Sequence, residues 1–338
     1  MENETVKQHL VPRCYLKNFK VQSIHKKKKT IHFVDALDKK NPKNEPFRAN
    51  IAEICTKEHW YTFTKLDGKD RMILEHYYAR TIEREYPNLY RKMVLERPLN
   101  LSNRERQEII KFCVMQYFRT SKLTNQFNNF WGSMFKKADQ MAKVHSQPLK
   151  IKFEDGPVLD FTGKPLENVI AEQTNSNREY INALTFTWAK EQTNLRKGDM
   201  IYIEEVTQEH QLITSDNPVY YFGNALDPTV MMKMPLDSTH LLTIYPAKHY
   251  LEGTPRFFFQ KLSGEMLEFE STFNNLYQIE NAERFIIGEK DSLLRAQGLS
   301  KNFDVEAFNS KVKSYTTKLT EQTDYIERTG TLPPNFEI

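Results

Sequence analysis

The pattern of apolar and polar positions divides the first 70 residues into a short helix and two strands. After Pro12, the spacing of Tyr15, Leu16 and Phe19 suits one face of a short helix. Residues 30–35 alternate between polar and apolar side chains, which indicates a strand, and residues 54–63 predict a second strand that ends at Asp67-Gly68. We expect these two strands to pair in one small sheet.

A helical period replaces the alternation from Asp70 onward. Apolar positions predict a helix that runs from residue 70 to Pro87, where the proline should end it. Ser102 and Glu105 have the spacing of a capping box, in which each side chain hydrogen-bonds the other residue's backbone N–H, so a second helix should begin there. Residues 125–144 are expected to continue helical.

The second half of the chain changes from helix to short strands. Residues 146–168 are rich in proline and glycine and indicate a loop or irregular hairpin. A second capping box at Ser176 and Glu179 predicts a helix that ends near Gly198, which suits a left-handed C-cap. Strands are expected at 200–206, 211–214, 219–222, 241–245 and 256–261, followed by a helix at 273–283.

An apolar stripe near the C-terminus predicts a long amphipathic helix that packs on the body of the protein. Its members are Val305, Phe308, Val312, Tyr315, Leu319 and Ile326. The expected fold is therefore α+β, with a helical lobe packed against a mixed or mainly antiparallel sheet and a long C-terminal helix. We divide the chain into an N-terminal small sheet plus helical lobe at 1–147, a loop or linker at 148–168, a helix plus β-rich lobe at 169–290 and the C-terminal helix at 291–338. One compact domain overall is the alternative.

Composition indicates a soluble cytoplasmic protein. None of the apolar runs among the 338 residues approaches the ~18 needed to span a bilayer, and the acidic N-terminus leads into no signal sequence, so no membrane partner is expected. Three widely spaced cysteines fit neither a disulfide framework nor a zinc site. Nothing in the composition fixes the oligomeric state.

The positive charge is concentrated near the N-terminus. Residues 1–60 contain 13 Lys and Arg against 7 Asp and Glu, a balance of +6, whereas the whole chain carries +4. The run Lys26–Lys29 could contact phosphates or form a solvated hairpin tip. Nucleic acid is thus the expected partner, if the protein has a macromolecular one.

Several site classes have no matching motif. The chain has no P-loop, no Gly-x-Ser-x-Gly elbow and no dinucleotide-binding glycine pattern. Metal ligands at close spacing are missing as well, since Glu75-His76 is only an adjacent pair. We therefore expect neither a metal nor a cofactor.

A turn at residues 212–219 is the most distinctive local feature. The apolar run Leu212-Ile213 meets Thr214, then Ser215-Asp216-Asn217, and Pro218 restricts the backbone of Asn217. The pattern predicts a strand that stops at a fixed turn, with a carboxylate and an amide at the end of a sheet.

The chain resembles a bacterial family called domain of unknown function family 4238. The resemblance rests on the following motifs in the same order and at similar separations: His9-x-x-Pro12-x-x-Tyr15-Leu16-x-x-Phe19, the helix with Glu75 and Glu83, Gln116-x-x-Arg119-Thr120, Thr214-Ser215-Asp216-Asn217-Pro218-Val219, and Asn275 followed by Ala282 and Arg284-Phe285-Ile286-Ile287. It spans roughly residues 7–290. Leu10 and the lysine-rich insertion depart from the family pattern.

The resemblance implies mixed α and β structure and no established reaction, and its motifs provide the candidate site. Catalytic candidates are His9, Glu75, Arg119 and Asp216, and binding candidates are Arg13, Glu83, Gln116 and Asn217. Histidine with carboxylates could perform acid–base chemistry, while arginine could hold a phosphate. If the helix is regular, Glu75 and Glu83 should border one groove.

Two hypotheses follow from these candidates. In the first, the protein is a stress or phage-defence effector that acts on nucleic acid as a metal-independent, nuclease-like hydrolase. In the second, it is a non-catalytic module that binds nucleic acid or protein, and the same residues form a polar scaffold: Asp216 and Asn217 close their own turn, and Arg119 pairs with a glutamate between helices.

Overall fold

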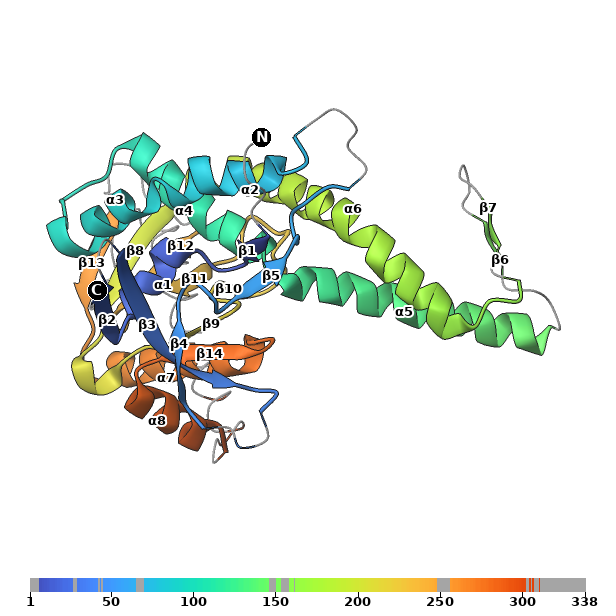
Figure 1. Cartoon of the computed structure of the whole chain (residues 1–338). Coiled ribbons are helices and arrows are strands. Elements are labelled where there is room, and N and C mark those ends of the chain that lie inside the picture. Colours follow the sequence, from blue (N-terminus) through green and yellow to red (C-terminus); the bar gives the residue numbers. More distant parts are fainter. Residues whose placement is uncertain are drawn as a thin grey trace.

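Helices and strands of the protein form a body from which a two-helix arm projects (Figure 1). The computed structural model describes residues 6–26, 29–41, 43, 45–64, 70–145, 150–152, 158–160, 162–247, 256–301, 304, 306 and 310. Its architecture combines helices with antiparallel and mixed sheets, so the predicted α+β class is confirmed.

The N-terminal third forms short strands and then a helical layer. The elements in order are β1 (Lys7–His9), α1 (Arg13–Leu16), the 3₁₀ helix η1 (Lys17–Phe19), β2 (Gln22–Lys26), β3 (Lys29–Asp38), β4 (Phe47–Asn50), β5 (Thr56–Glu58), α2 (Ile73–Tyr77), the π-helix η2 (Tyr78–Glu83), α3 (Tyr86–Tyr90), the π-helix η3 (Arg91–Glu96) and α4 (Asn103–Phe118). Both arms of the predicted Ser102 and Glu105 capping box are present at the start of α4.

The remaining two thirds build the arm, the main sheet and two covering helices. The arm contains α5 (Ser121–Val144), β6 (Lys150–Lys152), β7 (Val158–Asp160) and α6 (Leu166–Leu195). Then follow β8 (Met200–Glu205), the 3₁₀ helix η4 (Gln208–His210), β9 (Thr214–Ser215), β10 (Tyr220–Tyr221), β11 (Met232–Pro235), β12 (His240–Tyr245), β13 (Phe257–Lys261), α7 (Gly264–Asn281), β14 (Phe285–Gly288) and α8 (Lys290–Lys301).

Two five-stranded sheets carry the body. The first has the order β10-β11-β12-β8-β13 and is antiparallel except for the parallel pair β8 and β13. The second has the order β2-β3-β14-β9, with β4 also paired to β3. Because β14 pairs with β3 and β9, it joins the start, the middle and the end of the described chain. The two strands predicted at 30–35 and 54–63 do not pair with each other, since β5 pairs with β1.

The largest core cluster joins the helical layer to the sheets. Among its buried members are Tyr15 of α1, Val34 of β3, Ile110 of α4, Ile203 of β8 and Met234 of β11. Leu212 and Leu241 belong to a separate small cluster. Leu37 and Ile286 belong to another. The helical layer therefore packs directly on the sheets, and burial of apolar area is the main contribution to that contact.

Several predicted boundaries are wrong for identifiable reasons. Pro87 does not end the first helix; it lies in the first turn of α3, where its missing N–H needs no partner. No helix begins at Ser176, since α6 already starts at Leu166. The φ of Gly198 is not positive, so this residue is not the predicted left-handed C-cap. A β-carbon there would lie 2.9 Å from Cβ of Ala247, so close packing explains the glycine.

The loop predicted at 146–168 contains the hairpin of β6 and β7, which lies at the far end of the arm (Figure 1). It connects α5 to α6. Strand β11 was missed by the sequence patterns. The apolar stripe predicted for the C-terminal helix, from Val305 to Ile326, lies outside the described residues.

Candidate functional site

Arg119 is the centre of a polar cluster between α4, η2 and β1. Its guanidinium is buried: Nη1 contacts Oε1 of Glu83 at 3.0 Å and Nη2 donates to the backbone oxygen of His9 at 2.6 Å. The guanidinium carbon lies 4.3 Å from the ring centre of Tyr78, a cation–π contact. We call His9, Arg13, Glu75, Glu83 and Arg119 the Arg119 cluster.

Local backbone structure brings these residues together. Arg119 is the C-cap of α4, and its own carbonyl accepts a hydrogen bond from the Tyr61 hydroxyl at 2.6 Å. The pairing of β1 with β5 fixes His9 opposite Thr56. Glu75 lies in α2 and Glu83 ends the π-helix η2, so the regular 100° step expected between them does not apply. Both glutamates nevertheless interact with the same arginine.

His9 is a neutral imidazole with a defined tautomer. Its Nε2 lies 3.2 Å from the backbone oxygen of Ile51, and because a carbonyl only accepts, Nε2 must carry the proton. Nδ1 then holds the lone pair, and no partner for it is found among the described residues. Burial, with a smaller effect from the nearby Arg13, lowers the pKa of His9 to about 4.

Glu75 is shifted in the opposite direction. Burial raises the pKa of this carboxyl, and the nearby Glu83 raises it further, although Arg119 acts against the shift. Its Oε2 is buried without a hydrogen-bond partner in the described part of the chain. Arg13 is exposed on α1 and close enough to affect the pKa of both His9 and Glu75.

Gln116 supports the cluster from one turn earlier in α4. It is buried, and its Nε2 donates to the backbone oxygen of Leu10 at 3.1 Å. This bond holds the residue after His9 against α4. Because this hydrogen bond joins two parts of the fold, it does not test the binding role predicted for Gln116, and that role stays a prediction.

Asp216 and Asn217 lie in a different set of contacts. The Asp216 carboxylate accepts the backbone N–H groups of Glu283, Arg284 and Phe285 at 2.9, 2.9 and 3.1 Å. Asn217 donates to the backbone oxygen of Asn281 at 3.1 Å. The predicted turn at the end of a strand is confirmed, because β9 ends at Ser215, and the turn binds the link between α7 and β14.

The structure thus brings together part of the predicted site. His9, Arg13, Glu75, Glu83 and Arg119 interact with one another, and Gln116 braces them. Neither Asp216 nor Asn217 has a recorded contact with His9 or Arg119 in the described residues. Their catalytic and binding roles stay predictions.

The pKa of His9 predicts a distinct pH dependence of stability. An unfolded histidine has a pKa near 6.5, whereas folded His9 titrates at about 4. Between these values the unfolded state binds more protons, so stability falls as the pH falls through this window, by about 3 kcal/mol in total. His9→Gln, which retains an N–H donor for Ile51, should remove this component. Urea unfolding at pH 4.0, 5.5 and 7.0 measures the difference, and parallel pH curves for both proteins would contradict the assignment.

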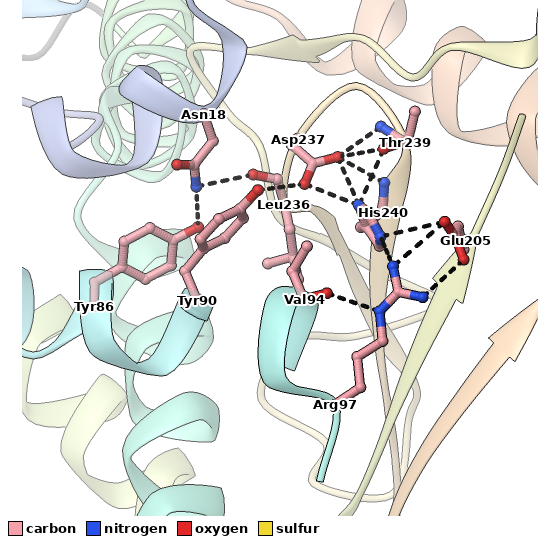
Figure 2. A network of polar contacts seen from close by, with 10 residues as sticks. All are labelled: Asn18, Tyr86, Tyr90, Val94, Arg97, Glu205, Leu236, Asp237, Thr239 and His240. Atoms are coloured by element: carbon pink, nitrogen blue, oxygen red, sulfur yellow. Dashed lines mark hydrogen bonds and ion pairs between the residues drawn. The ribbon is translucent and has the colours of Figure 1, made fainter. Parts of the chain in front are cut away.

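A second polar network was missed by the sequence patterns (Figure 2). Tyr90 of α3 donates to Asp237 at 2.6 Å, and Asp237 contacts Nδ1 of His240 at 2.9 Å. On the other side, Arg97 lies 3.3 Å from Nε2 of His240 and 3.2 Å from Glu205. The network ties the end of η3 to the ends of β8 and β12. The spacing Asp237-x-x-His240 after an apolar strand could have revealed it.

Arg97 also joins this network to β13 of the first sheet. It follows η3 in the left-handed backbone region, with φ of 47°, and its guanidinium carbon lies 3.9 Å from the ring centre of Phe259. Asp237 also accepts the backbone N–H groups of Thr239 and His240, which closes the turn between β11 and β12. With so many of its bonds internal, we assign the network a structural role.

Within the described residues, no three His, Cys, Asp or Glu side chains group as metal ligands would. None of the described helices combines the length and the apolar character that crossing a membrane requires.

Comparison with known proteins gives a family and no named relative. Neither a curated protein nor a solved structure matches the chain. The family model described as protein of unknown function (DUF4238) matches residues 7–292. That range includes all the members of the Arg119 cluster and the Asp216 turn. The chain therefore belongs to the DUF4238 family.

Proposed function

We propose that the protein is a metal-independent hydrolase that cleaves phosphodiester bonds of nucleic acid at the Arg119 cluster. The observation that carries the proposal is the pair of opposite pKa shifts within one cluster: His9 is lowered to about 4 and Glu75 is raised. Such a pair places a neutral imidazole near a carboxyl whose pKa is shifted upward, in the direction that suits a general acid.

The chemistry assigns one role to each group. Nδ1 of His9 accepts a proton from a water molecule as its oxygen attacks phosphorus, while Glu75 gives a proton to the oxygen that leaves. The bond from phosphorus to the leaving oxygen breaks as the new bond forms, so the products are a phosphomonoester and an alcohol. Arg13 is exposed, and no partner for it is recorded among the described residues, so it can bind the phosphate. Arg119, fixed on Glu83, positions His9 through the backbone oxygen.

A basic helical face supports a polyanionic substrate. Arg13, Lys17 and Lys20 are all exposed at intervals of four and three along α1, η1 and the following residue, a spacing that places side chains on one face. Lys17 and Lys20 also lie near His32 of β3, whose pKa is lowered mainly by burial and then by these lysines. The face extends from the Arg119 cluster to the β2–β3 hairpin, as expected for phosphate contacts.

Cleavage by purified full-length protein tests the proposal. Single-stranded and double-stranded DNA, RNA and tRNA are incubated with the protein in EDTA, and products are separated on denaturing gels. His9→Gln and Glu75→Gln should each lower the initial rate about 100-fold or more, since a general acid or base contributes roughly that factor.

Matched variants on exposed surfaces control for nonspecific effects. His145→Gln, after α5, and Glu209→Gln, in η4, should keep the parental rate. Circular dichroism at the assay temperature verifies that each variant is folded. The proposal fails if the parent cleaves none of the four nucleic acids, or if folded His9→Gln retains the full rate.

A non-catalytic binding module is the second candidate, and one observation favours it. Asp216 uses both carboxylate oxygens on backbone N–H groups, as a scaffold residue would. In that case the parent binds nucleic acid without cleaving it, and His9→Gln leaves affinity unchanged. In either form, the proposed biological setting is a bacterial stress or phage-defence response, tested by phage infection of cells that carry parent or variant.

A further inference from the structure

Helix α5 carries a repeating apolar seam along the arm. Its members, which are apolar except for one lysine, alternate at spacings of three and four residues, the pattern of a two-helix coiled coil: Phe127, Phe130, Met134, Lys137, Met141 and Val144. Phe127 and Met134 are separated by one heptad, and so are Phe130 and Lys137. The seam thus extends over more than two heptads, a length of about 26 Å in a helix.

The outer part of this seam is exposed in the described part of the chain. The side chains of Phe130, Met134, Met141 and Val144 are 59, 39, 64 and 80% exposed. Lys137 is also exposed. All of them belong to α5, which projects from the body as part of the arm (Figure 1). Four large apolar side chains on one helix face are more than the scattered exposure of a monomer surface.

Helix α6 packs on another side of α5. Phe135 and Val169 form a small buried cluster, with Trp131 and Ile170 packed against it. Trp131 and Phe135 follow Phe130 and Met134 by one residue each, which is about 100° around the helix. At the inner end of the seam, the ring centre of Phe127 lies 5.6 Å from that of Trp188 of α6, so this member also contacts α6. From Phe130 outward, the seam is separate from the contact between α5 and α6 and is open to a further helix.

We propose that the seam binds the same seam on a second copy of this chain, with the two α5 helices antiparallel. A seam of heptad spacing fits another helix of the same spacing, and a two-fold axis lets one surface pair with itself. With the axis near residues 135 and 136, Phe130 faces Met141 of the second copy. Phe127 then faces Val144, and Met134 faces Lys137.

Charge favours this direction over a parallel pair. In a parallel pair Lys137 would face Lys137 of the second copy, and two ammonium groups would meet in an apolar seam. In the antiparallel pair its aliphatic stem lies on Met134 and its charge reaches solvent. The flanking positions Gln126, Ser133 and Gln140 are uncharged, so identical helices meet without repulsion at the border of the seam. In the antiparallel pair, the bodies of the two copies also lie at opposite ends of the paired α5 helices, so they do not collide.

Sedimentation velocity of the full-length chain from 1 to 100 μM tests the contact. The parent should sediment as a dimer over the upper part of this range. Phe130→Glu and Met141→Glu should each sediment as monomers, because a carboxylate enters the seam. Asn129→Glu is the matched control, since it introduces the same charge on the same helix outside the seam and should leave the dimer intact.

Cysteine cross-linking tests the direction. In the antiparallel pair, the double variant Phe130→Cys/Met141→Cys should form a covalent dimer under mild oxidation. Met141→Cys alone should not, since the two residues at position 141 would be about 16 Å apart along the axis, beyond the reach of a disulfide. The parent, which retains its three native cysteines, gives the background.

Each alternative result overturns the proposal. A parent that remains monomeric at 100 μM, or a dimer that persists in Phe130→Glu and Met141→Glu, removes the seam as the interface. Cross-linking of Met141→Cys alone indicates a parallel pair. Melting temperatures of the variants should match that of a monomeric parent at low concentration, since the replaced side chains are exposed; a fall of many degrees would show that the seam is instead part of the fold.

Discussion

Replacing Asp216 by alanine should lower the free energy of unfolding by about 4 kcal/mol. The carboxylate accepts hydrogen bonds from the backbone N–H groups of Glu283, Arg284 and Phe285, and Asp216 is only 8% exposed. Alanine leaves those buried donors without an acceptor, and each loss of a charged hydrogen bond costs roughly 1.5–3 kcal/mol, partly offset where water reaches the gap. Urea unfolding at pH 7 followed by circular dichroism measures the change.

The matched control is Asp227→Ala. Asp227 also accepts a backbone N–H, from Thr229 at 2.8 Å, but it lies in a more exposed turn and water can replace it. We expect a loss of about 1 kcal/mol or less there. If Asp216→Ala unfolds no more easily than Asp227→Ala, then Asp216 does not brace the link between α7 and β14, and its carboxylate is better explained as a functional group.

Replacing Lys233 by methionine should cost about 3–5 kcal/mol, because it leaves two buried carboxylates without their cation. Nζ of Lys233 on β11 lies 3.2 Å from Glu204 of β8 and 2.5 Å from Glu270 of α7. All three side chains are buried. Burial already raises the pKa of Glu270 to about 7, while the lysine opposes the shift. Thermal and urea unfolding of the variant give the stability loss.

The pH dependence identifies the cause. A folded carboxyl whose pKa is raised from 4.5 to about 7 binds more protons than the unfolded one in that window, so its contribution to stability falls as the pH rises from 4.5 to 7. Without the lysine this fall should continue above pH 7. The double variant Lys233→Met/Glu270→Gln should recover part of the loss. A Lys233→Met protein as stable as the parent at pH 8 would contradict the assignment.

The fold class could be predicted because periodicity is local, whereas pairing is not. The alternation at 30–35 identified β3, and the Ser102 capping box located the start of α4. No local pattern shows that β3 pairs with β14, some 250 residues later in the chain. The π-helices η2 and η3 were also not predicted, since the apolar period over six residues does not distinguish a π-helix from an α-helix.

Much of the candidate site could be predicted for a different reason. The motif around His9 and the residues Glu75, Glu83 and Arg119 were linked through the family resemblance, and they do interact. Asp216 was predicted to be catalytic for the same reason, because a sequence motif does not distinguish a residue that holds its loop from one that faces a substrate. The Asp237 and His240 pair was missed because its partners, Tyr90 and Arg97, come from distant helices.

The position of β14 has a consequence for synthesis of the protein on the ribosome. Strand β3 emerges early, yet its partner strand β14 spans Phe285–Gly288. Strand β2 covers only the first half of this edge of β3, so until β14 is made, Asp35–Asp38 of β3 lack their partner strand there and stay open to other chains. The N-terminal sheet therefore completes only after most of the chain has been translated. Chains that stop before residue 285 should be prone to aggregation and depend on chaperones.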